Sequence, residues 1–207
     1  MEYWESKYNT EGAMWHFEPS DSAAIALSLF KTNGISNILI PGYGYGRNAK
    51  HFEEAGIEVT GIEISATAIA LARANGLKGT IHHGSVTEMP FNDRKFGGIF
   101  CYALLHLLNK PQRKKFIQAC YNQLARGGIM VFTVASRQMS YYGSGRVLSK
   151  DRFRIMNGLN VYFYDTISLQ REFAGCGIVE IKTIEEPIKF MIGQEPLKLL
   201  LIICRKT

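Results

Sequence analysis

Apolar and polar residues follow one another along this chain in short blocks that predict strands and helices in alternation. Short apolar runs predict five buried strands, near residues 37–41, 57–62, 80–83, 97–102 and 128–134. Between these runs, apolar residues spaced three or four apart predict helices near residues 46–55, 65–75 and 111–124. This order is typical of an α/β protein with a parallel sheet.

The two ends of the chain add further elements. Ser20 or Asp21 can cap a helix over residues 23–32, and Asp165 can cap another that reaches residue 174. Two more strands are predicted at the end of the chain, over residues 178–185 and 197–205.

The most informative motif follows the first predicted strand. Residues 38–40 are apolar, glycines occupy positions 42, 44 and 46, and Glu63 ends the next strand. Glycines at such a turn let the backbone approach a ligand, and an acid after the following strand can accept both ribose hydroxyls. The motif therefore predicts a site for an adenosine-containing cofactor, with a plain tight turn as the alternative.

The glycine spacing also separates two classes of cofactor. A dinucleotide fingerprint would place its third glycine at Arg47, whereas this chain has Gly46. Glycines at 42, 44 and 46 instead resemble the first motif of the class I S-adenosylmethionine (SAM) methyltransferases. Later landmarks of that superfamily follow in order, at residues 61–65, 83–86, 96–102 and 124–132.

The motif style is most similar to two branches of the superfamily, the thiopurine and thiol methyltransferases and the tellurite-resistance methyltransferases. Ile40 and Ser85 depart from the superfamily pattern, because both stand where an acid is usual. The resemblance covers roughly residues 35–135, and it extends to the N-terminal stretch, which lies over the cofactor in these relatives.

The resemblance implies SAM as the cofactor and S-adenosylhomocysteine as the product. In the superfamily's motifs the acid binds the ribose, the next apolar residue packs on the adenine, the third motif reaches the adenine edge, and the fourth strand meets the methionine amino group. The residues that match these motifs, and that we expect to bind the cofactor, are Gly42, Tyr43, Gly44, Gly46, Arg47, Glu63, Ile64, Ser85, Val86 and Tyr102.

The fold implied is of the Rossmann-like α/β class: a seven-stranded, mostly parallel sheet with helices on both faces and a C-terminal antiparallel hairpin. At 207 residues the chain is long enough for one such domain. We expect an N-terminal arm with a helix, a SAM-binding core, an insertion, and a final helix with the hairpin, at residues 1–34, 35–135, 136–164 and 165–207.

Methyl transfer from a sulfonium needs mainly alignment of the reacting atoms, which is worth about 7–11 kcal/mol in oriented reactions. A general base is optional, and His106 is the candidate because it follows the fourth strand at the carboxyl edge of the sheet. Its apolar neighbours favour a structural role as the alternative.

The insertion at residues 136–164 is the segment most suited to select a substrate, because it combines arginines and tyrosines with few acids. A solvated loop anchored by its aromatic residues is the alternative. The residues expected near the substrate, under a lid that excludes water, are Trp15, Tyr141, Tyr142 and Arg146.

Composition narrows the class of partner. The net charge of +6 raises the question of nucleic acid, but no recognition motif accompanies the basic residues, so a small molecule is favoured. Four cysteines without C-x-x-C spacing predict no metal site. No segment predicts a membrane span or signal peptide, so we expect a cytoplasmic protein, and the sequence leaves its oligomeric state open.

Three hypotheses follow. The leading one is a SAM-dependent methyltransferase that acts on a small thiol, chalcogen, oxyanion or hydroxyl compound; a protein or RNA acceptor is disfavoured. The second is a SAM-binding module without catalysis, consistent with the departures at Ile40 and Ser85. The third is a nicotinamide-dependent oxidoreductase, which the position of Gly46 disfavours.

Overall fold

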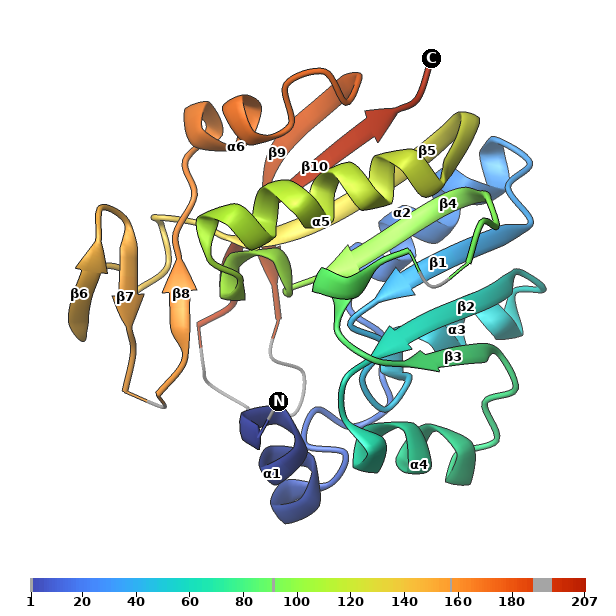
Figure 1. Ribbon diagram of the computed structural model, residues 1–207, viewed down its shortest axis with the longest axis horizontal. Coiled ribbons are helices and arrows are strands. Elements are labelled where there is room, and N and C mark those ends of the chain that lie inside the picture. Colours follow the sequence, from blue (N-terminus) through green and yellow to red (C-terminus); the bar gives the residue numbers. More distant parts are fainter. Residues whose placement is uncertain (1, 91, 157, 188–194) are drawn as a thin grey trace.

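A seven-stranded sheet forms the centre of the molecule (Figure 1). The computed structural model describes residues 2–90, 92–156, 158–187 and 195–207. The strand order is β3-β2-β1-β4-β5-β10-β9, in which the first five strands are parallel and β10 is antiparallel to both β5 and β9. Their bounds are β1 Asn37–Pro41, β2 Glu58–Glu63, β3 Thr80–His83, β4 Phe96–Tyr102, β5 Leu124–Ala135, β9 Ile178–Glu186 and β10 Leu197–Arg205. The predicted fold class, including the antiparallel hairpin, is confirmed.

Helices cover both faces of this sheet (Figure 1). One face carries α2 (Asp21–Thr32), α3 (Arg47–Glu54) and α4 (Ala66–Ala74), and the other carries α5 (Lys110–Gln123) and α6 (Thr166–Glu172). Because side chains alternate along a strand, neighbouring residues serve different cores. In β1, Leu39 packs with the helices α5 and α6, whereas Ile38 and Ile40 pack under α2 and α3. Burial on both faces explains why the strands read as continuous apolar runs.

The predicted helix starts are confirmed at residue level. Ser20 is the N-cap of α2, since its hydroxyl accepts a hydrogen bond from the Ala23 amide at 3.2 Å. Asp165 is the N-cap of α6 and accepts from the Ser168 amide at 2.7 Å. These caps satisfy amides that have no partner inside their helix.

Four parts of the structure are absent from the predictions. A helix, α1 (Glu2–Glu11), occupies the start of the N-terminal arm, which we define as residues 2–20. The insertion contains a three-stranded antiparallel sheet, called the accessory sheet here, made of β6 (Arg146–Ser149), β7 (Arg152–Arg154) and β8 (Asn160–Tyr162). Two short 3-10 helices, η1 (Val86–Glu88) and η2 (Leu105–Leu107), follow β3 and β4.

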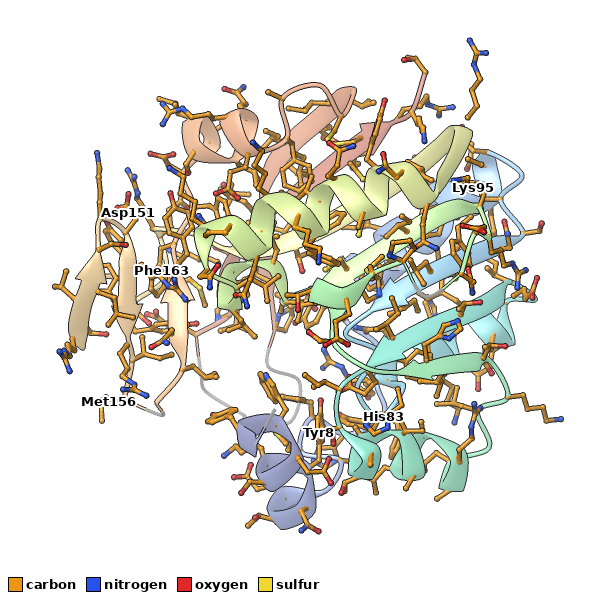
Figure 2. All side chains as sticks on the ribbon, in the orientation of Figure 1. Tyr8, His83, Lys95, Asp151, Met156 and Phe163 are labelled. Carbon is orange, nitrogen blue, oxygen red and sulfur yellow. The ribbon has the colours of Figure 1, made fainter. Side chains whose placement is uncertain are left out.

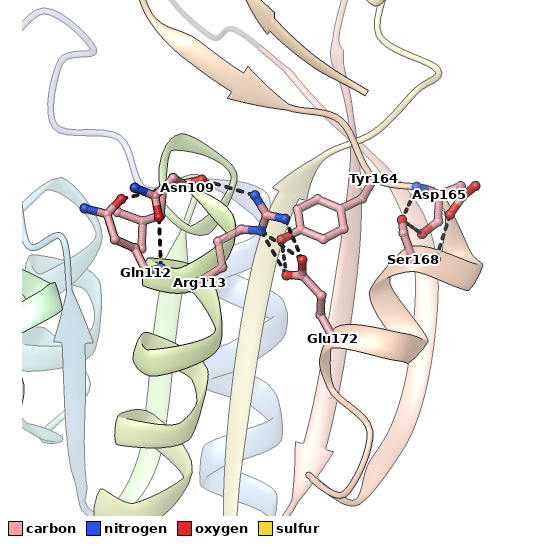
Figure 3. A network of polar contacts seen from close by, with 8 residues as sticks. Asn109, Gln112, Arg113, Tyr164, Asp165, Ser168 and Glu172 are labelled. Carbon is pink, nitrogen blue, oxygen red and sulfur yellow. Dashed lines mark hydrogen bonds and ion pairs between the residues drawn. The ribbon is translucent and has the colours of Figure 1, made fainter. Parts of the chain in front are cut away.

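A buried network fastens the accessory sheet to the domain (Figure 3). The guanidinium of Arg113, on α5, donates to both carboxylate oxygens of Glu172 on α6, with the shortest contact at 2.6 Å. The hydroxyl of Tyr164 donates to the same carboxylate at 2.7 Å. The guanidinium also lies 4.0 Å from the centre of the Tyr162 ring, on β8. The ion pair therefore joins α5 to α6, and its guanidinium also contacts β8.

Candidate cofactor and acceptor site

The glycines of the first motif form a loop between β1 and α3, which we call the cofactor loop (residues 42–46). Gly42, Gly44 and Gly46 have φ angles of 72°, 59° and 85°, in the left-handed region that favours glycine. At Gly44 an added Cβ would lie 3.0 Å from the Tyr8 hydroxyl, and at Gly42 it would lie 3.2 Å from Leu104. The loop therefore presents bare backbone at the switch point of the sheet, between β1 and β4, where α/β proteins bind ligands.

Glu63 lies beside this loop at the end of β2. One carboxylate oxygen accepts a hydrogen bond from the Gly44 amide at 2.6 Å, and the other accepts from the amides of Ile64 and Ser65 at 2.8 and 2.9 Å. Burial raises the pKa of Glu63, whereas these three hydrogen bonds lower it. A carboxylate offers about four acceptor sites, so the carboxylate is fixed in position with capacity left for a ligand hydroxyl.

Tyr43 and Arg47, at the two ends of the cofactor loop, have different surroundings. The Tyr43 ring is packed in the core against Gly61, and its hydroxyl donates to Glu53 at 3.3 Å. Any contact of Tyr43 with a cofactor therefore has to come from its backbone. Arg47 begins α3, and its guanidinium lies 5.2 Å from the centre of the Tyr102 ring at the end of β4. The structure thus brings two predicted cofactor residues, Arg47 and Tyr102, together.

The predicted adenine contacts lie beyond the end of β2 and after β3. Ile64 is half-buried, and its carbonyl oxygen is 3.2 Å from a ring nitrogen of His83. The Ser85 hydroxyl accepts from the Thr87 amide at 3.2 Å and also contacts the Thr87 hydroxyl at 2.8 Å. Val86 is buried in the core under α5. Ser85 therefore caps η1, and its hydroxyl is already hydrogen-bonded within the chain.

The backbone after β4 takes an unusual conformation. Ala103 has a φ of 50°, which is rare for a residue other than glycine, and its amide donates to the Thr133 carbonyl at 3.2 Å. The turn directs Leu104 towards Gly42. Backbone strain of this kind is common at functional sites, and here it lies next to the cofactor loop.

His106 is buried within η2. Its Nδ1 accepts a hydrogen bond from the Ala135 amide at 3.1 Å, and burial lowers the pKa of the imidazole to about 4. The basic nitrogen is therefore already occupied, and the ring is neutral near pH 7. This geometry supports the structural alternative for His106, and its catalytic role stays a prediction that the contacts do not favour.

The N-terminal arm is fastened beside the cofactor loop by the side chains of Tyr45 and Glu5, which the sequence pattern did not assign to the site. The Tyr45 hydroxyl donates to the His16 carbonyl at 2.6 Å and accepts from the Trp15 amide at 3.1 Å. At the other end of the arm, the Glu5 carboxylate accepts from the hydroxyls of Ser65 and Thr67, both at 2.6 Å. In the sequence, an acid near the N-terminus and a serine or threonine at a helix start give no sign that they interact. Only the tertiary structure shows that Glu5 contacts Ser65 and Thr67.

The residues predicted near the substrate divide into two groups. Tyr141 and Tyr142 both pack edge-on against Phe163, and Tyr142 donates to Asp151 at 2.8 Å. Arg146 is exposed on β6, the strand of the accessory sheet that lies farthest from β4 (Figure 1). In Figure 2, Asp151 and Met156 mark the two ends of this sheet, and Phe163 lies on its inner side. The structure therefore does not place Arg146 with the tyrosines.

Among the described residues, no group of three His, Cys, Asp or Glu side chains is placed to hold a metal ion. In the same part of the chain, no helix is long and apolar enough to cross a membrane.

The cofactor loop and the acid at the end of β2 lie in the segment that resembles known proteins. Residues 38–128 match a family model described as a methyltransferase domain. The fold of the whole chain is also that of solved SAM-dependent methyltransferases.

Solved structures share this fold at low sequence identity. The 1,6-didemethyltoxoflavin-N1-methyltransferase of Burkholderia thailandensis, solved with 1,6-didemethyltoxoflavin and S-adenosylhomocysteine, has a TM-score of 0.72 and 18% identity over 98% of this chain and 84% of its own. TehB from Haemophilus influenzae has a TM-score of 0.65 and 13% identity, and the match covers 89% of this chain and 62% of TehB. The magnesium protoporphyrin IX methyltransferase of Synechocystis PCC 6803, solved with bound SAM, has a TM-score of 0.65 and 11% identity. The match covers 100% of this chain and 90% of that enzyme. No curated protein sequence matches this chain significantly.

Proposed function

We propose that this protein transfers the methyl group of SAM to a small-molecule acceptor with an apolar or aromatic body. The observation that carries the proposal is the Glu63 carboxylate, which three backbone amides hold against the bare backbone of the cofactor loop. A buried acid fixed in this way is suited to the ribose hydroxyls of an adenosine. The chain's own contacts therefore fit SAM.

The cofactor and the protein have separate tasks in this proposal. When bound, SAM supplies a methyl group already activated by its positive sulfur. Glu63 binds the ribose, the cofactor loop lets the backbone approach the ligand, and Ile64 packs beside the adenine. The N-terminal arm, fastened through Tyr45 and Glu5, excludes water from the site.

We expect the acceptor to pack on an apolar cluster. Half-buried Tyr102, Leu107 and Tyr141 pack on a cluster around Phe163 that connects the end of β4 with the accessory sheet. Tyr141 also lines a pocket with residues from the start of β10. By contrast, Arg137 is neutralised by ion pairs to Asp151 and Asp165 at 2.6 Å each. These contacts favour an uncharged, planar or aliphatic body over an acidic one.

The surroundings of His106 and Tyr102 favour an acceptor atom that does not need a general base. Its Nδ1 is occupied by the Ala135 amide, and burial raises the pKa of the Tyr102 phenol to about 12. Neither group is suited to remove a proton at neutral pH. An atom that is already nucleophilic, such as a thiolate, an oxyanion or a ring nitrogen, needs no base, whereas a neutral hydroxyl does.

The test is calorimetric titration of the protein with SAM, S-adenosylhomocysteine and NADH, with Glu63→Gln as the variant. Loss of a charged hydrogen bond costs roughly 1.5–3 kcal/mol, so the affinity for both sulfur ligands should fall about 10- to 150-fold. Glu88→Gln is the matched control, since Glu88 is exposed on η1. Thermal melts of both variants check that the fold is kept.

The possible results separate the hypotheses. Binding of both sulfur ligands, followed by methylation in a screen of thiols, oxyanions and heteroaromatic rings, supports the proposal. Binding without turnover on any acceptor supports a module that binds SAM without catalysis. Binding of NADH alone, or of no ligand, contradicts the proposal.

A further inference from the structure

Tyr8 lies on α1, in the middle of the N-terminal arm, and its ring is nearly buried, with 7% of its surface exposed. The ring packs edge-on against Tyr45 and beside Trp4, with ring centres 6.1 Å apart in each case. The hydroxyl points to the cofactor loop, where it would lie 3.0 Å from a Cβ added to Gly44. Figure 2 shows Tyr8 and His83 at the same edge of the molecule, where α1 meets α4.

The Tyr8 hydroxyl has no hydrogen-bond partner among the residues that the structure describes. The other tyrosine of this cluster, Tyr45, uses its hydroxyl for two hydrogen bonds that fasten the arm. The Tyr8 hydroxyl is not itself sealed from solvent, so water can bind it, and a ligand that enters the site can take the place of that water. The position of the hydroxyl over a bare glycine indicates a ligand at this place.

The charges around the hydroxyl indicate which part of a ligand it meets. Burial raises the pKa of Tyr8, and the Glu63 carboxylate raises it further, whereas the Arg47 guanidinium lowers it. The phenol is therefore a protonated donor near neutral pH. Arg47 begins α3, forms no ion pair with a carboxylate in the described ranges, and lies at the positive end of that helix. The Tyr8 hydroxyl as a donor, the Arg47 guanidinium and the N-terminus of α3 together favour an anionic group of the ligand.

We propose that the Tyr8 hydroxyl is a cofactor ligand, supplied by the N-terminal helix, that donates a hydrogen bond to the carboxylate at the amino-acid end of SAM. That carboxylate is the only anionic group of the cofactor. The inference rests on the proposed function, since it assumes that the cofactor loop and Glu63 hold the adenosine part. It makes α1 a part of the binding site and not only a cover.

The experiment compares two ligands that differ at the amino-acid end. S-adenosylhomocysteine carries the carboxylate, and 5′-methylthioadenosine lacks the amino-acid part. Calorimetric titration with both is carried out on the wild type, on Tyr8→Phe and on Tyr3→Phe. Tyr3 is the matched control because it lies on the same helix, with its ring edge-on to Trp4.

The expected result is a loss of about 10-fold or more in affinity for S-adenosylhomocysteine in Tyr8→Phe, because a hydrogen bond to a charged group is removed. Affinity for 5′-methylthioadenosine should not change, and Tyr3→Phe should bind both ligands as the wild type does. Equal losses for both ligands would overturn the assignment to the carboxylate. Unchanged binding in Tyr8→Phe would overturn the proposal entirely.

A failure of the proposed function gives a different result, since the wild type would then bind neither ligand. Circular dichroism of Tyr8→Phe shows whether α1 is still folded, which keeps a loss of binding from being confused with a loss of the helix.

Discussion

Glu63 and His106 are both buried ionisable residues, and backbone amides decide what each can do. Three amides hold the Glu63 carboxylate as an acceptor beside the cofactor loop. One amide, from Ala135, occupies Nδ1 of His106, and burial lowers the pKa of that imidazole to about 4. The first residue is therefore suited to bind a ligand, whereas the second is suited to support the turn after β4.

His106 should make the folded state sensitive to acid. Its pKa is lower in the folded state than the ordinary value of about 6.5, so the unfolded chain binds the proton more readily and stability falls as the pH drops from 6.5 to 4. Between pH 7 and pH 4, protonation of His106 should lower the free energy of unfolding by up to about 3 kcal/mol. Urea unfolding at both pH values measures the loss, which should be smaller in His106→Asn.

His83→Asn is the control for this measurement, because His83 is exposed at the end of β3. It should keep the wild-type loss of stability on acidification. An equal loss in His106→Asn and the wild type would contradict the structural role given to His106.

At the scale of elements, the ion pair between Arg113 and Glu172 joins α5, α6 and β8. Only 3% of the Arg113 side chain is exposed, so its buried positive charge needs the Glu172 carboxylate as a partner. The pair between Lys50 and Glu54, on α3, is the opposite case, because 42% and 66% of these two side chains are exposed. The two pairs should therefore contribute very differently to stability.

Glu172→Ala should lower the free energy of unfolding by about 3–5 kcal/mol, because it leaves the Arg113 guanidinium buried without a carboxylate. Glu54→Ala should change it by no more than about 1 kcal/mol. Denaturant titration of both variants measures the difference. Similar losses in the two variants would show that the buried pair does not hold the accessory sheet to the domain.

The elements that sequence patterns missed are those that tertiary contacts stabilise. The strands of the accessory sheet have three or four residues each, too few to show a period. Helix α1 has no clear apolar face; Trp4 and Tyr8 pack on Tyr45, and the Glu5 carboxylate caps α4 from outside that helix. The helix depends on partners more than 30 residues away, which local propensity does not include.

At the scale of the whole molecule, the site is assembled from distant segments. The carboxylate of Glu186, at the end of β9, accepts hydrogen bonds from the amides of Asp21 and Ser22 at 2.6 and 3.1 Å. It therefore caps α2 and ties the C-terminal hairpin to the end of the N-terminal arm. Ligand binding at the cofactor loop should consequently stabilise the chain as a whole.

S-adenosylhomocysteine at 100 times its Kd should stabilise the protein by about 2.7 kcal/mol, since it binds only the folded state. For a chain of this size the melting temperature should rise by roughly 5–11 °C. In Glu63→Gln at the same ligand concentration the rise should be about half as large or less. Differential scanning fluorimetry measures both, and an unchanged melting temperature in the wild type would contradict the cofactor assignment.

The sequence by itself determined the central sheet, the helices on its faces and the position of the cofactor loop. These features depend on short-range patterns: apolar runs, caps at Ser20 and Asp165, and glycines at fixed spacing before an acid. The tertiary structure decided which side chains meet at the site. It placed Tyr43 in the core, occupied the basic nitrogen of His106, and brought Tyr8 and Glu5 to the cofactor loop and to α4. Such contacts join residues far apart in the chain, and they depend on how helices and strands pack, which no local pattern encodes.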